Sequence, residues 1–188
     1  MNRHIAGVDE AGRGSLAGPV IAGAVVFNEG DAIEGAFDSK RMSIRSRELM
    51  SRKIRTMALD WAIGAATAME IDKLNIHNAT LLAMRRAIIG LRVRVDYAYI
   101  DGKFCPDIPI PGEAVVRGDE IIPVISAASI LAKVFRDRQM IWIDGLYPCY
   151  GFRKHKGYPT EYHRAALKTN GPTPEHRMSY AGVVSDKI

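Results

Sequence analysis

The sequence predicts an α/β fold, in which a central sheet carries helices on both of its faces. Two patterns lead to this prediction. Short apolar, β-branched segments come first, and strand-like segments then alternate with longer segments whose apolar residues recur at helical spacing. The chain has 188 residues, about one domain's worth, so a single domain is expected.

Five segments have the composition of strands. Residues 5–8 form a short apolar run that ends at two acids, and residues 20–27 are apolar and β-branched. These two strands are expected to pair as a hairpin around a tight Gly-Arg-Gly loop. The other strands are predicted at residues 61–65, 95–100 and 114–117.

Four longer segments have helical character. Ser43 can cap a helix over residues 44–57, and Thr160 can cap one over residues 160–169 that Asn170 and Gly171 end. Apolar spacing predicts the other two, at residues 78–91 and 126–143. Thr173-Pro174 is typical of the cap and first residue of a further short helix. Loops are predicted at residues 28–36, 103–113 and 151–159.

Composition excludes several classes of protein. The chain is 47% hydrophobic and 25% charged, which argues against disorder and collagen-like fibres. It has 2 cysteines, too few for a disulfide scaffold or a CxxC zinc site. No apolar run reaches the roughly 18 residues of a membrane span, and charges come too early for a signal peptide. We therefore expect an intracellular, cytoplasmic protein with no membrane association.

The net charge of +5 is distributed unevenly. Seven Lys and Arg stand against two acids in residues 38–55, and six stand against two in residues 150–177. Two basic stretches on a mildly acidic remainder favour a polyanion such as nucleic acid as the partner. The alternative is that both stretches are ordinary solvated surface.

Four acids stand at positions that suggest metal chemistry. Asp9 and Glu10 end the first predicted strand, Asp101 ends the fourth, and Asp137 lies on the long helix. Open α/β sheets bind ligands at the carboxyl ends of their strands. Carboxylates there could hold Mg²⁺, and two ions about 3.5–4 Å apart can catalyse phosphodiester cleavage.

Two objections apply to this site. Neighbours on a regular strand point to opposite faces, so Asp9 and Glu10 can share a site only if the strand breaks after them, at residues 11–14. The second objection is that Lys133 lies four residues before Asp137, where the two would form an ordinary helical ion pair. Each acid could therefore be simple surface.

No rival chemistry stands out in the sequence. Ser126 and Ser129 lie among small residues, which is typical of packing or capping. Asp119 follows a glycine as a turn residue does. The Gly12-Arg13-Gly14 loop has too few glycines for a Walker A or dinucleotide-binding loop. Polar contacts are expected for the histidines of the basic C-terminal third, His155, His163 and His176.

Seven segments, in order along nearly the whole chain, resemble the motifs of ribonuclease HII, the type-2 ribonuclease H. Ser15 and Met42 depart from the family pattern, where Pro and Leu are expected, but neither position can supply catalytic chemistry. The segments are GVDEAGRGSLAGPV (7–20), DSK (38–40), ATLLAM (79–84), IDG (100–102), SAASILAKVFRDR (126–138), KGYPT (156–160) and HRMS (176–179).

The resemblance implies a ribonuclease H-like fold: a mixed sheet of about five strands flanked by helices, with a helical C-terminal extension. Residues 1–188 would form one catalytic domain, with an α/β core at 1–145 and a basic substrate-binding extension at 146–188. It implies hydrolysis of RNA in RNA–DNA hybrids. It also implies incision 5′ to single ribonucleotides in duplex DNA, which leaves 5′-phosphate and 3′-hydroxyl ends and begins ribonucleotide excision repair.

The resemblance also implies residue roles. The metal-binding catalytic tetrad would be Asp9, Glu10, Asp101 and Asp137. It would hold two Mn²⁺ or Mg²⁺ ions: Asp9 would bridge them, Asp137 would help hold the ion that activates water, and Glu10 and Asp101 would hold the ion at the leaving 3′ oxygen.

Substrate contacts are implied as well. Gly12, Arg13 and Gly14 would read the 2′-hydroxyl, since glycine lets backbone approach a sugar closely. Tyr158 would pack at the RNA–DNA junction. Further substrate contacts are implied for Lys40, Ser126 and Lys156.

Three alternatives compete with this interpretation. A catalytically silent nucleic-acid-binding protein of the same fold would be expected to lack one of the four acids. Ribonuclease HIII carries an extra N-terminal domain, for which Asp9 lies too near Met1. A small-molecule phosphatase would not explain the spread of basic residues. A monomer is the default expectation, and no motif for docking on a replication clamp is recognisable in residues 179–188.

Overall fold

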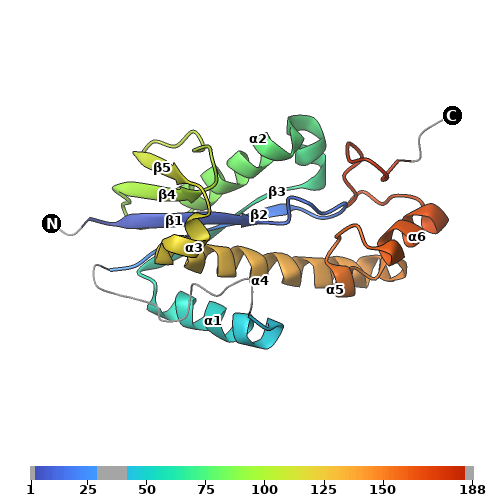
Figure 1. The fold of residues 1–188 in the computed structure, drawn as a ribbon, viewed down its shortest axis with the longest axis horizontal. Helices are drawn as coiled ribbons and strands as arrows, with labels where there is room; N and C mark the ends of the chain where they lie inside the picture. The colour runs from blue at the N-terminus through green and yellow to red at the C-terminus, as the bar shows by residue number, and fades with distance from the viewer. Residues whose placement is uncertain (1–2, 29–41, 185–188) are drawn as a thin grey trace.

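The fold is built around one five-stranded sheet with the strand order β3-β2-β1-β4-β5 (Figure 1). The structure, a computed structural model, describes residues 3–28 and 42–184. β1 pairs antiparallel with β2 and parallel with β4, so the sheet is mixed, as the resemblance implies. The strands are β1 (Ile5–Ala11), β2 (Val20–Val26), β3 (Asp60–Ala66), β4 (Tyr97–Asp101) and β5 (Gly112–Val115).

Helices cover both faces of the sheet, which confirms the predicted layers. Figure 1 shows α2 (Ala68–Ile89) above the sheet, with α4 (Pro123–Leu146) and α1 (Ile44–Met57) below it. Glycines let both layers approach closely. A Cβ on Gly64 would lie 2.1 Å from the Ala83 carbonyl oxygen of α2, and one on Gly23 would lie 2.6 Å from that of Ala128 in α4.

The C-terminal part of the chain packs against the far end of α4. It contains the short turns η2 (Pro148–Tyr150) and α5 (Phe152–His155), and then α6 (Glu161–Asn170). Leu16 and Ala17 pack with Met140, Phe152 and Leu167 in an apolar cluster of their own. The connection between β1 and β2 is thus held from the other end of the sequence.

Two helices extend beyond their predicted bounds. α2 begins at Ala68, ahead of the predicted residue 78, because Thr67 and Glu70 form a capping box. Asn75, with a φ of 66°, interrupts this helix, and the prediction captured only the part beyond it. α4 runs over Pro123–Leu146, three residues further at each end than predicted.

Several short elements differ from the predictions. β5 occupies Gly112–Val115 and not 114–117, α3 (Gly118–Ile121) was not predicted, and α5 lies in the predicted loop 151–159. No helix begins at Pro174. The Thr173 N–H instead donates to His176 Nδ1 (2.9 Å), and His176 forms a bridge with Ala17.

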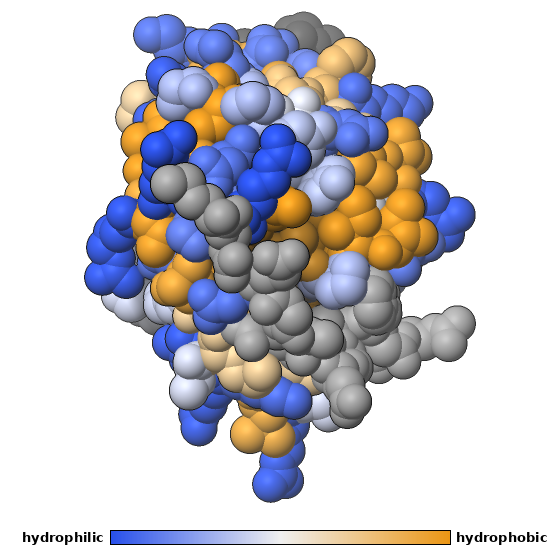
Figure 2. Space-filling view, turned by 90° about the vertical axis from the view of Figure 1, so that its left-hand side faces the viewer, coloured by the Kyte–Doolittle hydropathy of each residue, from blue (hydrophilic) through white to orange (hydrophobic). Residues whose placement is uncertain are grey.

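The opposite end of the molecule, where β1 begins, is seen in Figure 2. Polar and apolar side chains are interspersed on this face, as on an ordinary protein surface. Among the described residues, no helix has the length and apolar character needed to cross a membrane.

Candidate active site

Three of the four expected acids converge where β1 and β4 end. Oxygen atoms of Asp9, Glu10 and Asp101 all lie within 4.8 Å of one another. β1 and β4 pair only as far as Val8 and Ile100, so the acids lie where the two parallel strands separate. The carboxyl end of the parallel pair is therefore the centre of the site.

The strand ends within the residues that the sequence predicts, since β1 stops at Ala11 and Gly12 has a φ of 99°. Asp9 and Glu10 themselves still lie in regular strand, paired with Gly23 and Ala22 of β2. The two neighbouring acids share a site because β1 and β4 are no longer paired beyond Val8 and Ile100, which leaves the edge of β1 open beside the acids. The backbone N–H of Glu10 also donates to Asp9 Oδ1 at 2.7 Å, which orients the Asp9 carboxylate.

The pKa values of Asp9 and Glu10 are both raised, chiefly by burial. Burial raises the pKa of Asp9 well above its usual range, and the charges of Glu10 and Asp101 raise it further, while a hydrogen bond from Ser129 opposes the shift. Burial also raises the pKa of Glu10, against the influence of Arg13 at 3.5 Å. A cluster of this kind is stabilised by a cation, and its oxygen donors fit a hard divalent ion such as Mg²⁺ or Mn²⁺.

The fourth acid lies apart from this cluster. Asp137 Oδ1 accepts a hydrogen bond from Lys133 Nζ at 2.8 Å, which is the helical ion pair that the spacing of the two residues predicts. Asp137 lines a neighbouring cavity of about 250 Å³ together with Arg47, Arg153 and Lys156. The structure thus brings together Asp9, Glu10 and Asp101 and leaves Asp137 beside them on α4.

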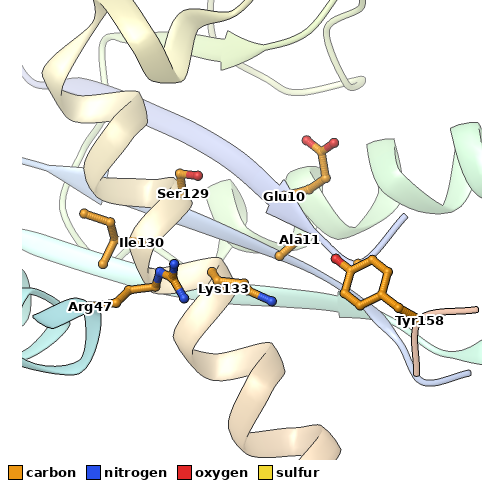
Figure 3. A pocket seen from close by; sticks show the side chains of 8 residues that line it. Glu10, Ala11, Arg47, Ser129, Ile130, Lys133 and Tyr158 are labelled. Carbon is orange, nitrogen blue, oxygen red and sulfur yellow. The ribbon is translucent and has the colours of Figure 1, made fainter. Parts of the chain in front are cut away.

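A cavity of about 330 Å³ opens next to the acids. In Figure 3, Arg47 reaches toward it from α1, Lys133 from α4 and Tyr158 from the segment after α5, and Glu10 stands at its edge. Its lining combines two cations, an aromatic ring and glycine backbone. These are groups that suit a phosphate backbone and a sugar or base.

The Gly-Arg-Gly loop begins at the wall of this cavity. Gly12 has a φ of 99°, and a Cβ there would lie 1.8 Å from Arg136 Nε, so only glycine fits. Arg13 is half exposed and pairs with Glu10. Gly14, by contrast, has open space around it. The loop therefore combines one fixed glycine with backbone that is open to a ligand.

Tyr158 has a fixed backbone and an available ring. Its N–H donates to the His155 carbonyl at 2.9 Å, and its carbonyl accepts from Thr160 N–H at 2.8 Å. Its ring centroid lies 5.5 Å from Lys133 Nζ and 5.5 Å from Arg136 Cζ. The ring lines the cavity, and α6 packs through Ala166 and Leu167, so contact between the Tyr158 ring and a ligand stays a prediction.

Comparison with known proteins agrees with this geometry. The sequence model of the family described as Ribonuclease HII matches residues 6–183. The chain belongs to the ribonuclease HII family. A ribonuclease HII from Desulforamulus reducens is 51% identical over 177 residues, covering 94% of this chain and 89% of the relative. One from Coxiella burnetii is 54% identical over 187 residues, covering 100% of this chain and 93% of the relative.

A solved structure shares the fold as well. The ribonuclease H2 from Pyrococcus horikoshii has a TM-score of 0.77 and 27% identity, covering 96% of this chain and 95% of that one. The ribonuclease H-like fold expected from the family's motifs is therefore confirmed.

Three further residues of this family member, Ser126, Lys156 and Lys40, were predicted to contact substrate, and Asp119 was predicted to lie in a turn. Ser126 is fully buried in the first turns of α4, which suits the packing interpretation. Lys156 stands in the left-handed region, with a φ of 53°. Asp119 is a buried residue of α3, not a turn residue, and its N–H donates to Asp101 Oδ1 at 3.3 Å. Lys40 lies outside the described residues.

Sequence reasoning missed several residues of the site. Ser129 and Lys133 were not assigned to the site, although they and the predicted Asp137 recur every fourth residue on α4 and so lie on one face of the helix. Arg47 was counted only as part of a basic stretch. Arg136 and Arg177, both fully buried, gave no local signal because their partners are distant in sequence.

Proposed function

We propose that this member of the ribonuclease HII family is a metal-dependent endonuclease acting on RNA–DNA hybrids and on duplex DNA that contains single ribonucleotides. The observation that carries the proposal is the convergence of Asp9, Glu10 and Asp101 beside a cavity with basic, aromatic and glycine walls. The incision lies 5′ to the ribonucleotide and leaves 5′-phosphate and 3′-hydroxyl ends.

The acids hold the metal ions. Asp9 would be shared by the two ions, and Glu10 and Asp101 would hold the ion beside the leaving 3′ oxygen. Asp137 would help hold the second ion. When bound, two Mg²⁺ or Mn²⁺ ions supply an activated water and stabilise the charge on the leaving oxygen.

The surrounding residues select and place the substrate. Backbone at residues 12–14 contacts the 2′-hydroxyl, which distinguishes RNA from DNA. The Tyr158 ring packs on the sugar or base at the junction, while Arg47 and Lys133 bind phosphates that flank the cleaved bond. The basic residues of the C-terminal part, among them Arg153 and Lys156, bind the phosphates further along the duplex.

The alternatives explain less of the site. A catalytically silent binding protein has no use for three clustered carboxylates, two of them with raised pKa values, beside a polyanion site, since they repel the ligand when no metal is bound. A small-molecule phosphatase leaves the basic residues beyond the cavity unexplained. We further propose that the protein acts as a monomer in the cytoplasm.

The test uses a labelled DNA duplex that carries one ribonucleotide. With Mg²⁺ or Mn²⁺ we expect a cut on the 5′ side of the ribonucleotide, and with EDTA we expect no cut. An all-DNA duplex of the same sequence is the control substrate and stays intact. Cleavage that persists in EDTA, or that occurs equally in all-DNA duplex, contradicts the proposal. Light scattering of the free protein checks the monomer, which has a mass of 20.7 kDa.

A further inference from the structure

Two arginine side chains are buried beside the loop of residues 12–19, and most of their hydrogen bonds go to backbone carbonyl groups. Arg136 on α4 and Arg177 near the C-terminus are both 0% exposed. Among the described residues, neither forms an ion pair with a carboxylate. A buried cation is costly unless its donors are satisfied, so the bonds of these two guanidinium groups need an explanation.

Arg177 binds the carbonyl groups of the loop between β1 and β2. Its Nη2 donates to the Gly12 carbonyl at 2.7 Å and to the Gly18 carbonyl at 2.9 Å. Its Nη1 donates to the Arg13 carbonyl at 2.8 Å, and its Nε donates to Gly18 at 3.0 Å. Tyr180 reinforces the same point, because its hydroxyl donates to the Arg13 carbonyl at 2.7 Å and accepts from Arg177 Nη1.

Arg136 binds the other end of this loop and the segment that carries Tyr158. Its Nε donates to the Pro19 carbonyl at 3.0 Å and its Nη2 to the Ala17 carbonyl at 3.2 Å. Its Nη1 donates to the Lys156 carbonyl at 3.0 Å. The same guanidinium carbon lies 5.5 Å from the Tyr158 ring. One side chain therefore touches both elements to which substrate recognition is assigned.

Only arginine can make this set of bonds. Its planar fork of five donors has a fixed geometry, whereas a lysine ammonium is a compact point charge that cannot span several carbonyls. Residues 12–19 belong to no helix or strand; Leu16 and Gly18 form backbone hydrogen bonds with the C-terminal part of the chain, and the two guanidinium groups bind the carbonyls of Gly12, Arg13, Ala17, Gly18 and Pro19.

We propose that Arg136 and Arg177 are positioning residues that hold the backbone of residues 12–18 and Tyr158 in a fixed relation, and that this relation sets the preference for ribose over deoxyribose. The inference rests on the proposed function and deepens it. Neither arginine has exposed surface with which to touch substrate, so both act through the backbone that they bind.

The test measures selectivity directly. The KM is determined for a duplex with one ribonucleotide, and the KI is determined for the all-DNA duplex of the same sequence as a competitor. In Arg177→Lys and Arg136→Lys we expect the ratio of KI to KM to fall by roughly tenfold, about 1.4 kcal/mol, with KI nearly unchanged. Tyr180→Phe removes one bond to the Arg13 carbonyl and is expected to lower the ratio about threefold.

Arg86→Lys is the matched control. Arg86 is also a structural arginine, bound to Glu70 and to the Ala65 carbonyl, but it lies on α2 away from the loop. Its variant should lose stability and keep the wild-type ratio. Thermal melting of every variant separates loss of fold from loss of selectivity. If a lysine variant does not fold, Tyr180→Phe decides, because its change is small and near the surface.

Two results overturn the inference in distinguishable ways. A selective wild type with equally selective folded variants removes the positioning role and leaves the proposed function standing. A wild type that binds both duplexes equally removes the preference in binding and with it the positioning role, whereas the proposed function fails only if the wild type also cuts the all-DNA duplex or cuts in EDTA.

Discussion

Lys133 Nζ lies 2.8 Å from Asp137 Oδ1, so the acid that stands apart from the other three is paired with a cation one helical turn away. The two side chains are 30% and 17% exposed. An i,i+4 pair of this kind contributes only about 0.3–0.5 kcal/mol. Asp137 can therefore leave Lys133 at little cost when a divalent ion and a phosphate arrive, and the pair does not oppose a catalytic role.

Asp137→Asn should separate the two metal positions. We expect cleavage to fall by at least about a hundredfold, because a ligand of the proposed second ion is removed. Binding of Mn²⁺ to the free protein, measured by calorimetry, should stay near the wild-type value, since Asp9, Glu10 and Asp101 are untouched. A variant that loses Mn²⁺ binding altogether would place Asp137 in the primary site.

Asp9→Asn should lose both cleavage and Mn²⁺ binding. The amide keeps an acceptor for the Glu10 N–H but removes a buried charge whose pKa is raised, so we expect Mn²⁺ binding and cleavage to be abolished. The melting temperature should stay equal or rise by about 2–4 °C, the equivalent of about 1 kcal/mol at this size. Asp96→Asn, at the far end of β4 beside Arg94, is the control and should cleave normally. Near wild-type cleavage by Asp9→Asn would refute the metal assignment.

The basic C-terminal residues should control the salt dependence of binding. Replacing Arg153, Lys154 and Lys156 by Ala should weaken duplex binding and flatten the plot of log K against log salt, by about 0.9 for each phosphate that the variant no longer binds. The position of the cut should not move. Arg94→Ala, an exposed arginine at the other end of the molecule, should leave the slope unchanged. An unchanged slope in the triple variant would show that this stretch is only solvated surface.

Tyr158 should act through its ring. Tyr158→Phe keeps the ring and should retain most activity. Tyr158→Ala should lose roughly tenfold or more on single-ribonucleotide duplexes, because stacking on a base is worth about 1–3 kcal/mol. The loss should be smaller on uniform hybrids, which offer many equivalent positions. Equal losses on both substrates, with a lowered melting temperature, would instead support a purely structural ring.

Two buried histidines should make the fold sensitive to acid. His163 Nδ1 donates to the Tyr158 carbonyl at 3.0 Å, so its Nε2 is free to accept from His176 Nε2 at 3.1 Å. His176 Nδ1 in turn accepts from the Thr173 N–H at 2.9 Å. Both rings are therefore held neutral. Burial, with His163 as a further cause, lowers the pKa of His176 to about 4 from its ordinary value of 6.5.

A lowered histidine pKa gives stability that is present above pH 6.5 and is lost as the pH falls toward 4, because the unfolded chain binds the proton first. The wild type should thus lose roughly 2 kcal/mol more than His176→Asn between pH 7 and pH 4.5. The asparagine keeps an acceptor for Thr173, and comparing the two proteins cancels the contribution of the carboxylates. His4→Asn, near the start of β1, should follow the wild type. Parallel melting curves for wild type and His176→Asn would contradict the neutral pair.

Much of the fold and the site could be predicted from local pattern. The five strands and the long helices have apolar patterns that are visible in the sequence, and the acids stand near the ends of β1 and β4. Prediction of an element from its local sequence failed where a residue of that element binds a partner elsewhere in the fold. Thr173-Pro174 has the composition of a helix start, but its Thr173 N–H is taken by His176, which pairs with Ala17 on the far side of the sequence.

The convergence of Asp9 with Glu10 was not predictable from β1 alone. It depends on the pairing of β1 with β4 ending at Val8 and Ile100, a property of strand pairing that no single segment encodes. The partners of Arg136 and Arg177 could not be predicted either, because both arginines bind backbone carbonyl groups of distant residues, and these groups are the same in every residue type. The capping box at Thr67 and Glu70 was present in the sequence and could have placed the start of α2 correctly.

The bonds from Arg177 to the loop after β1 also constrain how a newly made chain can become active. The Gly12 carbonyl and its guanidinium partner are 165 positions apart. At typical elongation rates the second is made roughly 10–30 s after the first. All strands of the sheet have been synthesised before then, but the loop proposed to read ribose still lacks its hydrogen bonds to Arg177. Substrate discrimination is therefore expected to be among the last properties gained during synthesis, and the first to disappear if the C-terminal residues are removed by a protease.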